Sequence, residues 1–439
     1  MTSSRNEPSV PSESISLEGH IMDSGALSRV LDEINAAGAT FEMVDLQIGT
    51  QTDDMSLAHL RVTADSEEDL DALIERLSQH GANTDTIVDA QLAVADVEGA
   101  FPPGFYSTTN LDTEVRVEGH WIRVERPEMD CGIVVSDGTA RTIPMADVET
   151  GMQIVMGGHG IRVTAATAPA EGDASFSFMS SDVSSEKPKA LLVEQVAKQM
   201  REIKSSGRRI LWVAGPAVVH TGSAPDLCAL IRAGYVDALF AGNGVAAHDI
   251  EANMFGTSLG VYLAQGVAAE HGHEHHIRAI NEIRRHGSFK AAIEAEVFHG
   301  GIVYELVQRG ADYIFGGSVR DDGPLPEVIT DMRDVQARLR DVIWGTKDQE
   351  PIGFCIVVGT MLHGIATGNC LPAHVPLVCV DINQATVTKL MDRGSFQSIG
   401  IITDVGLFIR ELAEHLAAEE LHLPSEEAAV REAGSQATQ

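Results

Sequence analysis

Residues 353–381 of the chain read GFCIVVGTMLHGIATGNCLPAHVPLVCVD. The run 354–358 is apolar and β-branched, which predicts a strand buried on both faces. Glycines follow in 359–364, and a second apolar run ends at Asp381. A dinucleotide-binding fold has this arrangement, because the glycines let the backbone approach the pyrophosphate and an acidic residue about 20 positions on accepts the ribose hydroxyls. An aspartate there repels a 2′-phosphate, so the pattern favours NAD over NADP. The alternative is an ordinary strand–helix turn with a capping aspartate.

From Arg209 onward the chain alternates apolar runs with helical patterns. The apolar runs are short and rich in Val and Ile, which is typical of parallel strands covered by helices on both faces. The last helix, 405–416, has its apolar residues at helical spacing. The predicted strands are 210–214, 236–241, 313–315, 354–358, 377–380 and 399–402. We therefore expect an α/β fold whose C-terminal part is a Rossmann-like parallel sheet.

Polar side chains follow three of these strands, namely Asn243, Asp381 and Asp404. Ligands of open α/β sheets bind beyond the carboxyl ends of the strands, so these residues are candidates for one crevice. Each of them taken singly is equally typical of a turn or a helix cap, and that alternative stays open.

A fourth strand-end loop, 316–324, contains Arg320 and Asp322 between glycines. Arg320 could bind a carboxylate with two hydrogen bonds, and Asp322 could bind a ribose or an ammonium group. A local ion pair between the two side chains explains the pattern equally well. The loop after the first strand contains Pro216, which has no N–H group, so it is the poorer candidate for holding phosphate.

The N-terminal half follows a different pattern. Strands at 15–21, 41–48, 57–64 and 86–95 and two helices, near 27–34 and 66–77, give the order β-α-β-β-α-β of a ferredoxin-like unit. Short β-rich runs separated by glycine turns then fill 114–178 and predict a small β-rich domain. The expected organisation is a disordered leader (1–13), a ferredoxin-like domain (14–112), a β-rich domain (113–185), a nucleotide-binding domain (186–422) and a flexible tail (423–439).

Composition excludes several functions. The chain has 439 residues with 64 acidic and 31 basic side chains, a formal net charge of −33, and only 5% aromatic residues. Nucleic-acid binding needs clustered basic or aromatic side chains, so no nucleic-acid partner is expected. No apolar run reaches the length of about 18 residues that a membrane span needs, and the polar N-terminus predicts a cytoplasmic protein. The acidity favours a salt-rich habitat over a chance surface composition.

Cysteines and histidines give no metal motif. The five cysteines include no C-x-x-C pair, which fits a reducing compartment, and Cys370 is interpreted as a small buried apolar residue. Four histidines gather between His271 and His276, but supporting ligand spacing is missing. We interpret this cluster as a solvated loop and expect no bound metal.

Several blocks of the sequence together resemble one family. They are LEGHIMDSG (17–25), VAGPAVVHTG (213–222), GNGVAAHDIE (242–251), the loop 318–326 and VGTMLH (358–363). The chain resembles the archaeal-type ornithine cyclodeaminases, which begin with a region shared by lysine-oxoglutarate reductase and saccharopine dehydrogenase (LOR/SDH). It also resembles the C-terminal half of the cyanobacterial arginine dihydrolase/ornithine cyclodeaminase. The likeness covers roughly residues 15–420, and the arginine dihydrolase half is not expected.

The resemblance implies an NAD-dependent ammonia-lyase that converts L-ornithine to L-proline and ammonia, with the hydride returned to the product. The family pattern implies NAD contacts at Asn243, Gly244, Asp322, Thr360, Met361, Leu362, His363, Asp381, Asp404 and Val405. Gly244 stands where the family pattern leads us to expect alanine. By position, we expect Asp249 to act as base or ammonium ligand, His248 as proton shuttle and Arg320 as carboxylate clamp.

Two other functions remain open at this stage. One is an amino-acid oxidoreductase of the saccharopine type, with net NADH production. The other is an NAD-binding regulator without catalytic activity, in which the ferredoxin-like domain senses a small molecule or pairs subunits. We also expect the chain to form a homo-oligomer.

Overall fold

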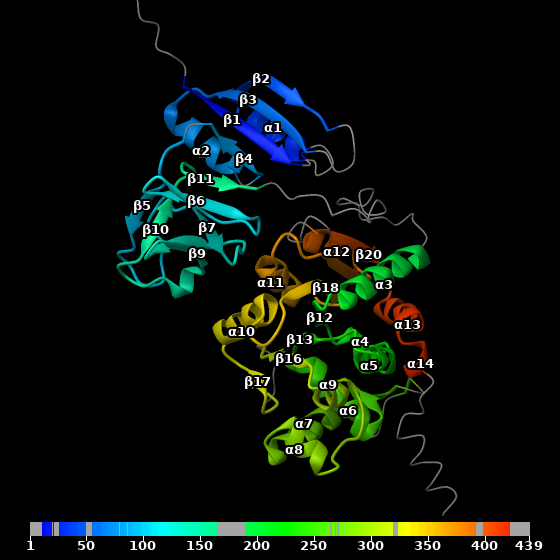
Figure 1. Ribbon diagram of the computed structural model, residues 1–439. Helices are drawn as coiled ribbons and strands as arrows, with labels where there is room; N and C mark the ends of the chain where they lie inside the picture. The colour runs from blue at the N-terminus through cyan, green and yellow to red at the C-terminus, as the bar shows by residue number, and fades with distance from the viewer. Residues whose placement is uncertain are drawn as a thin grey trace, which may run out of the picture. The chain divides into compact units, whose positions relative to one another are not determined.

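The computed structural model describes residues 11–19, 21, 26–49, 55–78, 80–85, 87–164, 189–263, 266–267, 269, 272–318, 324–391 and 398–421. The described residues fall into two compact units, one formed by the chain up to residue 180 with Asn369–His374, the other by the rest. Figure 1 shows the elements of both. No described helix combines the length and apolarity needed to cross a membrane.

The first sheet of the N-terminal unit has four strands in the order β2-β3-β1-β4, and all neighbours are antiparallel. Its strands are β1 (Ser12–Gly19), β2 (Thr40–Gln47), β3 (Ser56–Thr63) and β4 (Ala82–Thr84). Two helices, α1 (Ala26–Ala36) and α2 (Glu67–Ser78), contact each other. Val30, Ile34 and Leu73 of these helices are buried in one apolar core. Leu17 of β1 and Leu60 of β3 belong to the same core.

Two sequence predictions about this region are wrong. The expected strand 86–95 is not the fourth strand of the sheet, because the shorter β4 occupies that place and pairs with β1. The leader 1–13 is too long, because β1 begins at Ser12; residues 1–10 lie outside the described part of the chain. In both cases the local pattern is weak, and pairing with a distant strand decides the boundary.

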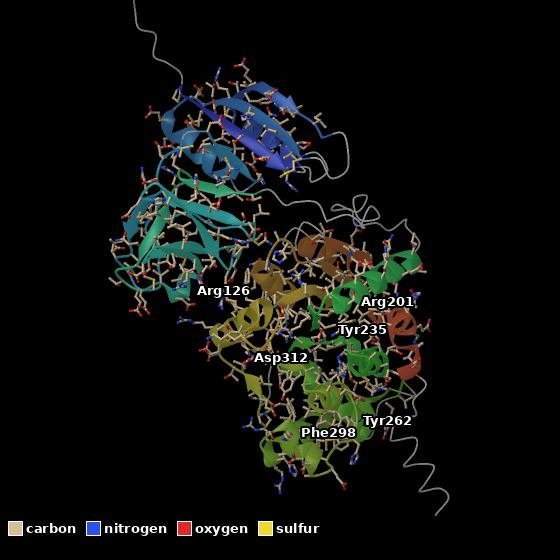
Figure 2. The ribbon with its side chains drawn as sticks, viewed as in Figure 1. Arg126, Arg201, Tyr235, Tyr262, Phe298 and Asp312 are labelled. Carbon is tan, nitrogen blue, oxygen red and sulfur yellow. The ribbon has the colours of Figure 1, made fainter. Side chains whose placement is uncertain are left out.

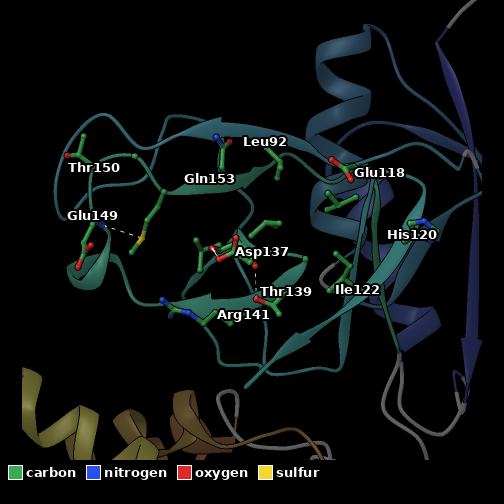
Figure 3. Close-up of a pocket in the computed structure, with 17 residues that line it drawn as sticks. Leu92, Glu118, His120, Ile122, Asp137, Thr139, Arg141, Glu149, Thr150 and Gln153 are labelled. Atoms are coloured by element: carbon green, nitrogen blue, oxygen red, sulfur yellow. Dashed lines mark hydrogen bonds between the residues drawn. The ribbon is translucent and has the colours of Figure 1, made fainter.

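The second sheet of this unit has seven strands in the order β11-β6-β7-β9-β8-β10-β5. They are β5 (Gln91–Val94), β6 (Thr113–Val117), β7 (His120–Glu125), β8 (Gly132–Ser136), β9 (Thr139–Ile143), β10 (Gln153–Met156) and β11 (Ile161–Val163). Neighbours are antiparallel except β7 and β9. A hollow of about 1090 Å³ lies against its strands (Figure 3).

The C-terminal unit contains a parallel sheet in the order β17-β16-β13-β12-β18-β19-β20. Its strands are β12 (Arg209–Ala214), β13 (Ala238–Gly242), β16 (Asp312–Gly316), β17 (Val328–Ile329), β18 (Ile352–Val358), β19 (Leu377–Asp381) and β20 (Ser398–Ile402). Apart from the short β17, this is the doubly wound order 3-2-1-4-5-6. The expected C-terminal Rossmann sheet is therefore confirmed.

Helices cover this sheet in two layers. In one, α13 (Val405–Leu416) packs against α3 (Lys189–Ser205) and α5 (Ala224–Arg232), and α5 packs against α9 (Ile302–Arg309). In the other, α10 (Met332–Trp344) contacts β16 and β18, and α12 (Gln384–Met391) contacts β19 and β20. The remaining described helices are α4 (Ala217–His220), α6 (Asn243–Phe255), α7 (His275–His286), α8 (Phe289–Glu294), α11 (Leu362–Cys370) and α14 (Ala418–Leu421).

Charged residues form a hydrogen-bonded cluster at the amino ends of the parallel strands, opposite the loops that follow their carboxyl ends. Asp312 begins β16 (Figure 2) and accepts hydrogen bonds from Arg209, Arg338 and Gln349. Arg209 and Asp312 are both mostly buried, so each needs the other as a partner. Ion pairs therefore stabilise the amino ends of the strands, whereas glycines lie in the loops at their carboxyl ends.

Candidate functional site

The candidate site lies at the carboxyl ends of the parallel strands, where the strand order reverses between β12 and β18. The loops after these two strands touch through their backbones. A Cβ atom built on Gly215 would lie 1.9 Å from the carbonyl oxygen of Gly359, and Gly359 has φ +61°. Both positions therefore need glycine, one for lack of space and the other for its backbone conformation.

The loop after β18 offers amide donors to an anion. The amides of Gly215 and Gly359 bind the carbonyl oxygens of Val358 and Val380, at 2.9 and 3.0 Å. The donors that remain are those of the first turn of α11, which begins at Leu362 and by its geometry leaves its first amides without intrahelical partners. Helix N-termini bind phosphate groups, and this one borders the point where the strand order reverses, at which open α/β sheets bind their ligands.

Asp381 ends β19, one strand along from the glycine loop after β18, which is the spacing of a ribose-binding acid. Its Oδ1 accepts a hydrogen bond of 2.8 Å from the amide of Asn383, and the described residues give its Oδ2 no partner. One carboxylate oxygen therefore shapes the turn and the other can accept ribose hydroxyls. Asp404 lies at the next strand end but caps α13, accepting from the Leu407 amide at 3.0 Å. The alternative of a helix cap thus describes what Asp404 does in this structure.

Apolar side chains stand exposed beside these polar groups. Ile382 and Leu362 are each 74% exposed, and Met361 and Leu407 are also exposed. They follow β18, β19 and β20, so they surround the strand ends that bear Asp381. Exposed apolar side chains at a strand-end crevice suit a flat heterocycle such as adenine. The sequence analysis did not predict Ile382 and Leu407 as site residues. Each is apolar in the segment that follows a strand, where a solvated turn would carry a polar residue, and this pattern could have indicated them.

His363, predicted as an NAD contact, reaches across to the neighbouring half of the sheet. Its ring lies edge-on to Phe240 with centroids 4.8 Å apart, and its Nδ1 lies 3.3 Å from Thr360 Oγ1. A Cβ atom on Gly242 would lie 3.3 Å from the ring. Burial lowers the pKa of His363, so the ring is neutral at pH 7 and can only form uncharged contacts.

Asn243 and Gly244 open α6 at the end of β13. Asn243 is buried, and its Oδ1 accepts a hydrogen bond of 3.1 Å from the Leu325 amide, so it holds the chain that follows β16. A Cβ atom on Gly244 would meet only Pro216, at 3.8 Å, so the alanine expected from the family pattern would fit. Val405 is buried next to Gly359. Two further predicted residues, Arg320 and Asp322, lie outside the described part of the chain.

Two imidazoles face each other on the other half of the sheet. His220 ends α4, which follows β12, and His248 lies in α6, which follows β13; their ring centroids are 4.9 Å apart. His220 Nδ1 lies 2.7 Å from the hydroxyl of Ser258. Burial first, and then His248, lower the pKa of His220. A charge on His220 is therefore disfavoured, first by its burial and then by the neighbouring ring.

Glu251 stands behind His248. Its carboxylate lies 2.9 Å from His248 Nδ1 and is fully buried, whereas His248 is 13% exposed. Burial alone would raise the pKa of Glu251, but hydrogen bonds from His248, Gly260 and Thr257 outweigh burial and lower it. Glu251 is therefore ionised, and it was missed by sequence reasoning although it lies three residues after His248.

Asp249, predicted as base or ammonium ligand, is occupied elsewhere. It is buried, and its two oxygens accept the amides of Ile302 and Val303 at 2.9 and 2.8 Å, at the start of α9. Burial raises its pKa to about 6, against the lowering effect of these two hydrogen bonds. A carboxylate that binds a helix end with both oxygens has little left for a bound molecule, so Asp249 is less available to a ligand than the sequence suggests.

The interpretation of the histidine cluster as a solvated loop is wrong for its last two members. His275 and His276 begin α7; the Nδ1 atom of His275 lies 2.8 Å from Thr257 Oγ1, and the His276 ring centroid lies 6.4 Å from that of His248. Packing of α7 against α6 brings them there, which local sequence does not show. Among the described residues no three His, Cys, Asp or Glu side chains are placed to hold a metal.

The hollow on the second sheet of the N-terminal unit differs from the candidate site in its lining and in its sheet type. Its charged lining side chains, Arg141, Glu118, Asp137 and Glu149, belong to the N-terminal unit (Figure 3). Its strands are mostly antiparallel, so they form no row of carboxyl strand ends like that of the parallel sheet. Size alone therefore does not make it the candidate site, which we place at the strand ends of the parallel sheet.

Comparison with known proteins agrees with this fold. Three family models match consecutive parts of the chain: the LOR/SDH bifunctional enzyme conserved region (12–111), the first C-terminal region of the ArgZ-like arginine dihydrolases (112–193) and their C-terminal Rossmann fold (194–412). An ornithine cyclodeaminase of Methanothermobacter thermautotrophicus is 45% identical over 397 residues, which cover 90% of this chain and 95% of that protein.

Two solved structures of longer proteins are also similar. The ligand-free structure of ArgZ, an arginine dihydrolase from the ornithine–ammonia cycle in cyanobacteria, is 36% identical with a TM-score of 0.79. The ternary complex of AgrE with ornithine and NAD⁺ is 40% identical with a TM-score of 0.50. Each match covers 94% of this chain, which spans 59% of the ArgZ chain and 58% of the AgrE chain. The chain therefore belongs to the archaeal ornithine cyclodeaminase family, with the LOR/SDH region at its N-terminal end and a Rossmann fold related to the C-terminal part of ArgZ and AgrE.

Proposed function

We propose that the chain is an NAD-dependent ornithine cyclodeaminase, which converts L-ornithine to L-proline and ammonia. One observation carries the proposal: Asp381 lies on one half of the doubly wound sheet, and the His220–His248 pair lies on the other. A dinucleotide crosses between the halves where the strand order reverses. An adenosine held at Asp381 therefore directs the nicotinamide toward the imidazoles.

The described residues fit NAD. Asp381 Oδ2 is available for the ribose, the first turn of α11 offers amides, and Ile382 and Leu362 provide an apolar surface. When bound, NAD would accept a hydride from the α-carbon of ornithine and return it after ring closure. The reaction is then redox-neutral.

The side chains of the protein move the protons. In the proposal, the Nε2 atom of His248 takes a proton from the α-amino group, which lets the α-carbon become an imine carbon. The δ-amine then attacks this carbon, and His248 returns its proton to the departing ammonia. Arg320 remains our proposal for the substrate carboxylate, and the geometry gives Asp249 the role of fixing α9 instead of acting as the base.

The comparisons support this substrate and cofactor. The Methanothermobacter relative is named as an ornithine cyclodeaminase, and AgrE has been crystallised with ornithine and NAD⁺. The saccharopine-type oxidoreductase and the regulator without activity remain as outcomes of the experiment below.

We further propose that the N-terminal unit contains two domains. The strand order β2-β3-β1-β4 with antiparallel neighbours supports a ferredoxin-like domain. Because β5 pairs with β10 of the second sheet, the boundary between the two domains falls near residue 86 rather than at residue 112.

The function is tested by incubating the purified chain with L-ornithine and an amount of NAD far below that of ornithine, in molar salt. The proposal expects proline and ammonia in equal amounts without accumulation of NADH. One NADH per ornithine would instead support an oxidoreductase. Bound NAD with no product would support the regulator.

A further inference from the structure

The surroundings of Glu251 form a complete set of hydrogen-bond donors. Its Oε2 lies 2.9 Å from His248 Nδ1 and accepts the Leu259 amide at 3.2 Å. Its Oε1 accepts the Thr257 hydroxyl at 3.0 Å and the Gly260 amide at 2.9 Å. The two amides can only donate, and the Thr257 hydroxyl donates its hydrogen to Oε1. A carboxylate that lies among such donors is ionised, and it forces the fourth partner, His248 Nδ1, to donate as well.

The tautomer of His248 follows from this contact. A neutral imidazole carries its hydrogen on one nitrogen and a lone pair on the other. With the hydrogen on Nδ1, the lone pair lies on Nε2, and no described residue makes a hydrogen bond with Nε2. Glu251 thus leaves His248 able to take a proton from a bound molecule.

The backbone around Glu251 is bent to make these contacts. The hairpin of β14 (Thr257–Ser258) and β15 (Val261–Tyr262) turns through Leu259 and Gly260. Leu259 has φ +52°, a conformation costly for a residue with a side chain, and its side chain is 59% exposed. Its strained backbone nevertheless donates to Glu251, so the hairpin is folded around this carboxylate.

We propose that Glu251 is a positioning residue of the cyclodeaminase reaction, which holds His248 with its hydrogen on Nδ1 so that Nε2 serves as the base. The inference rests on the proposed function for its kinetic part, whereas the tautomer can be measured without turnover. The other titratable groups that face His248 are His220 from α4 and His276 from α7, with His275 linked to Glu251 through Thr257.

The substitution Glu251→Gln keeps the size of the side chain and removes its charge. With the oxygen of the new amide toward Thr257 and Gly260, its NH₂ group faces both His248 Nδ1 and the Leu259 amide. The hydrogen bond from Leu259 is lost, and the hydrogen of His248 shifts to Nε2, which removes the base. We expect kcat to fall about 100-fold or more, in the range of a lost general base. NAD affinity and the KM for ornithine should change by less than about threefold, because the Glu251 side chain is fully buried and its partners are groups of the protein.

Two further variants separate positioning from a structural role. Thr257→Val also removes a buried hydrogen bond to Glu251 but leaves the contact with His248, so kcat should stay within about threefold of the wild-type value. Glu282→Gln removes the charge from a second, partly exposed glutamate–histidine pair, formed with His286 on α7, and should leave kcat unchanged. A fall in kcat for Thr257→Val as large as that for Glu251→Gln would overturn the proposal.

The tautomer is read directly from ¹⁵N chemical shifts of histidine-labelled protein without substrate, with the His248 signals assigned by their loss in a His248→Gln variant. The proposal expects hydrogen on Nδ1 in the wild type and on Nε2 in Glu251→Gln. The same tautomer in both proteins would overturn it. If wild-type protein forms no proline, the proposed function fails, yet this measurement still decides what Glu251 does.

Discussion

The contact between Gly215 and Gly359 makes the meeting point of β12 and β18 sensitive to a single methyl group. In Gly215→Ala the new Cβ would lie 1.9 Å from the Gly359 carbonyl oxygen, whereas real Cβ atoms stay at least 3.0 Å away. The two loops must therefore separate by about 1 Å, and neither atom belongs to a flexible side chain. Overpacking of this kind reduces the free energy of unfolding by about 1–3 kcal/mol.

The same displacement moves the first turn of α11, where the pyrophosphate is proposed to bind. A shift of about 1 Å can reduce the efficiency of a positioned site by about 100-fold, and we expect NAD affinity to fall by at least tenfold. Gly244→Ala is the matched control, because its Cβ would meet only Pro216, at 3.8 Å. In the first turn of α6 this alanine should stabilise the protein by about 0.5–1 kcal/mol and leave NAD affinity unchanged.

Isothermal titration with NAD and chemical unfolding of the wild type and both variants provide the measurement. Wild-type affinity and stability in Gly215→Ala would refute the close approach of the two loops. An equal loss of affinity in both variants would show that any added methyl group near the crevice is harmful, and the geometric argument would fail.

Four further predictions concern the cofactor site and its electrostatics. Asp381→Ala should weaken NAD binding about 10–100-fold in titration calorimetry, because hydrogen bonds to a charged group contribute about 1.5–3 kcal/mol; unchanged affinity would exclude Asp381 as the ribose acceptor. Ile382→Ser should weaken NAD binding without lowering the melting temperature, since the side chain is 74% exposed; a lower melting temperature with full affinity would contradict the assignment. Asp249, with its pKa raised to about 6, keeps a proton in the folded state that the unfolded chain releases, so its contribution to the free energy of unfolding falls by up to about 3 kcal/mol between pH 4 and pH 6. Urea unfolding at several pH values should show this fall in the wild type but not in Asp249→Asn. The same dependence of the free energy of unfolding on pH in both proteins would contradict the prediction. NAD affinity should rise with added salt, because the net charge of −33 repels an anionic dinucleotide until it is screened; constant or falling affinity would count against this.

The parallel sheet could be predicted because its strands carry their own signal. All seven residues of β18 are buried, so the whole run had to be apolar, and α13 shows its buried residues at regular helical spacing. Asp381 could be placed because its distance from Gly359 reflects one strand–helix–strand unit. The parallel sheet and the strand-end position of Asp381 could therefore be predicted because one local segment contains each pattern.

The imidazole side of the site could not be predicted in the same way. Glu251, Thr257 and His275 come together only because α6, the hairpin and α7 pack against one another. In the sequence His275 stands among polar residues and looks solvated, and Asp249 looks as suitable as His248. Only the amides of α9 show that Asp249 is occupied, and those lie more than 50 residues away.

The central claim is that ornithine loses its α-nitrogen and that its α-hydrogen returns to the product. Ornithine labelled with ¹⁵N at the α-amino group and with deuterium at the α-carbon tests both points in one mass-spectrometric measurement with catalytic NAD. The account predicts ¹⁵N in the released ammonia, none in the proline ring, and deuterium retained at the α-carbon of proline. Proline that contains ¹⁵N, proline that has lost the deuterium, or NADH formed in proportion to ornithine would contradict it.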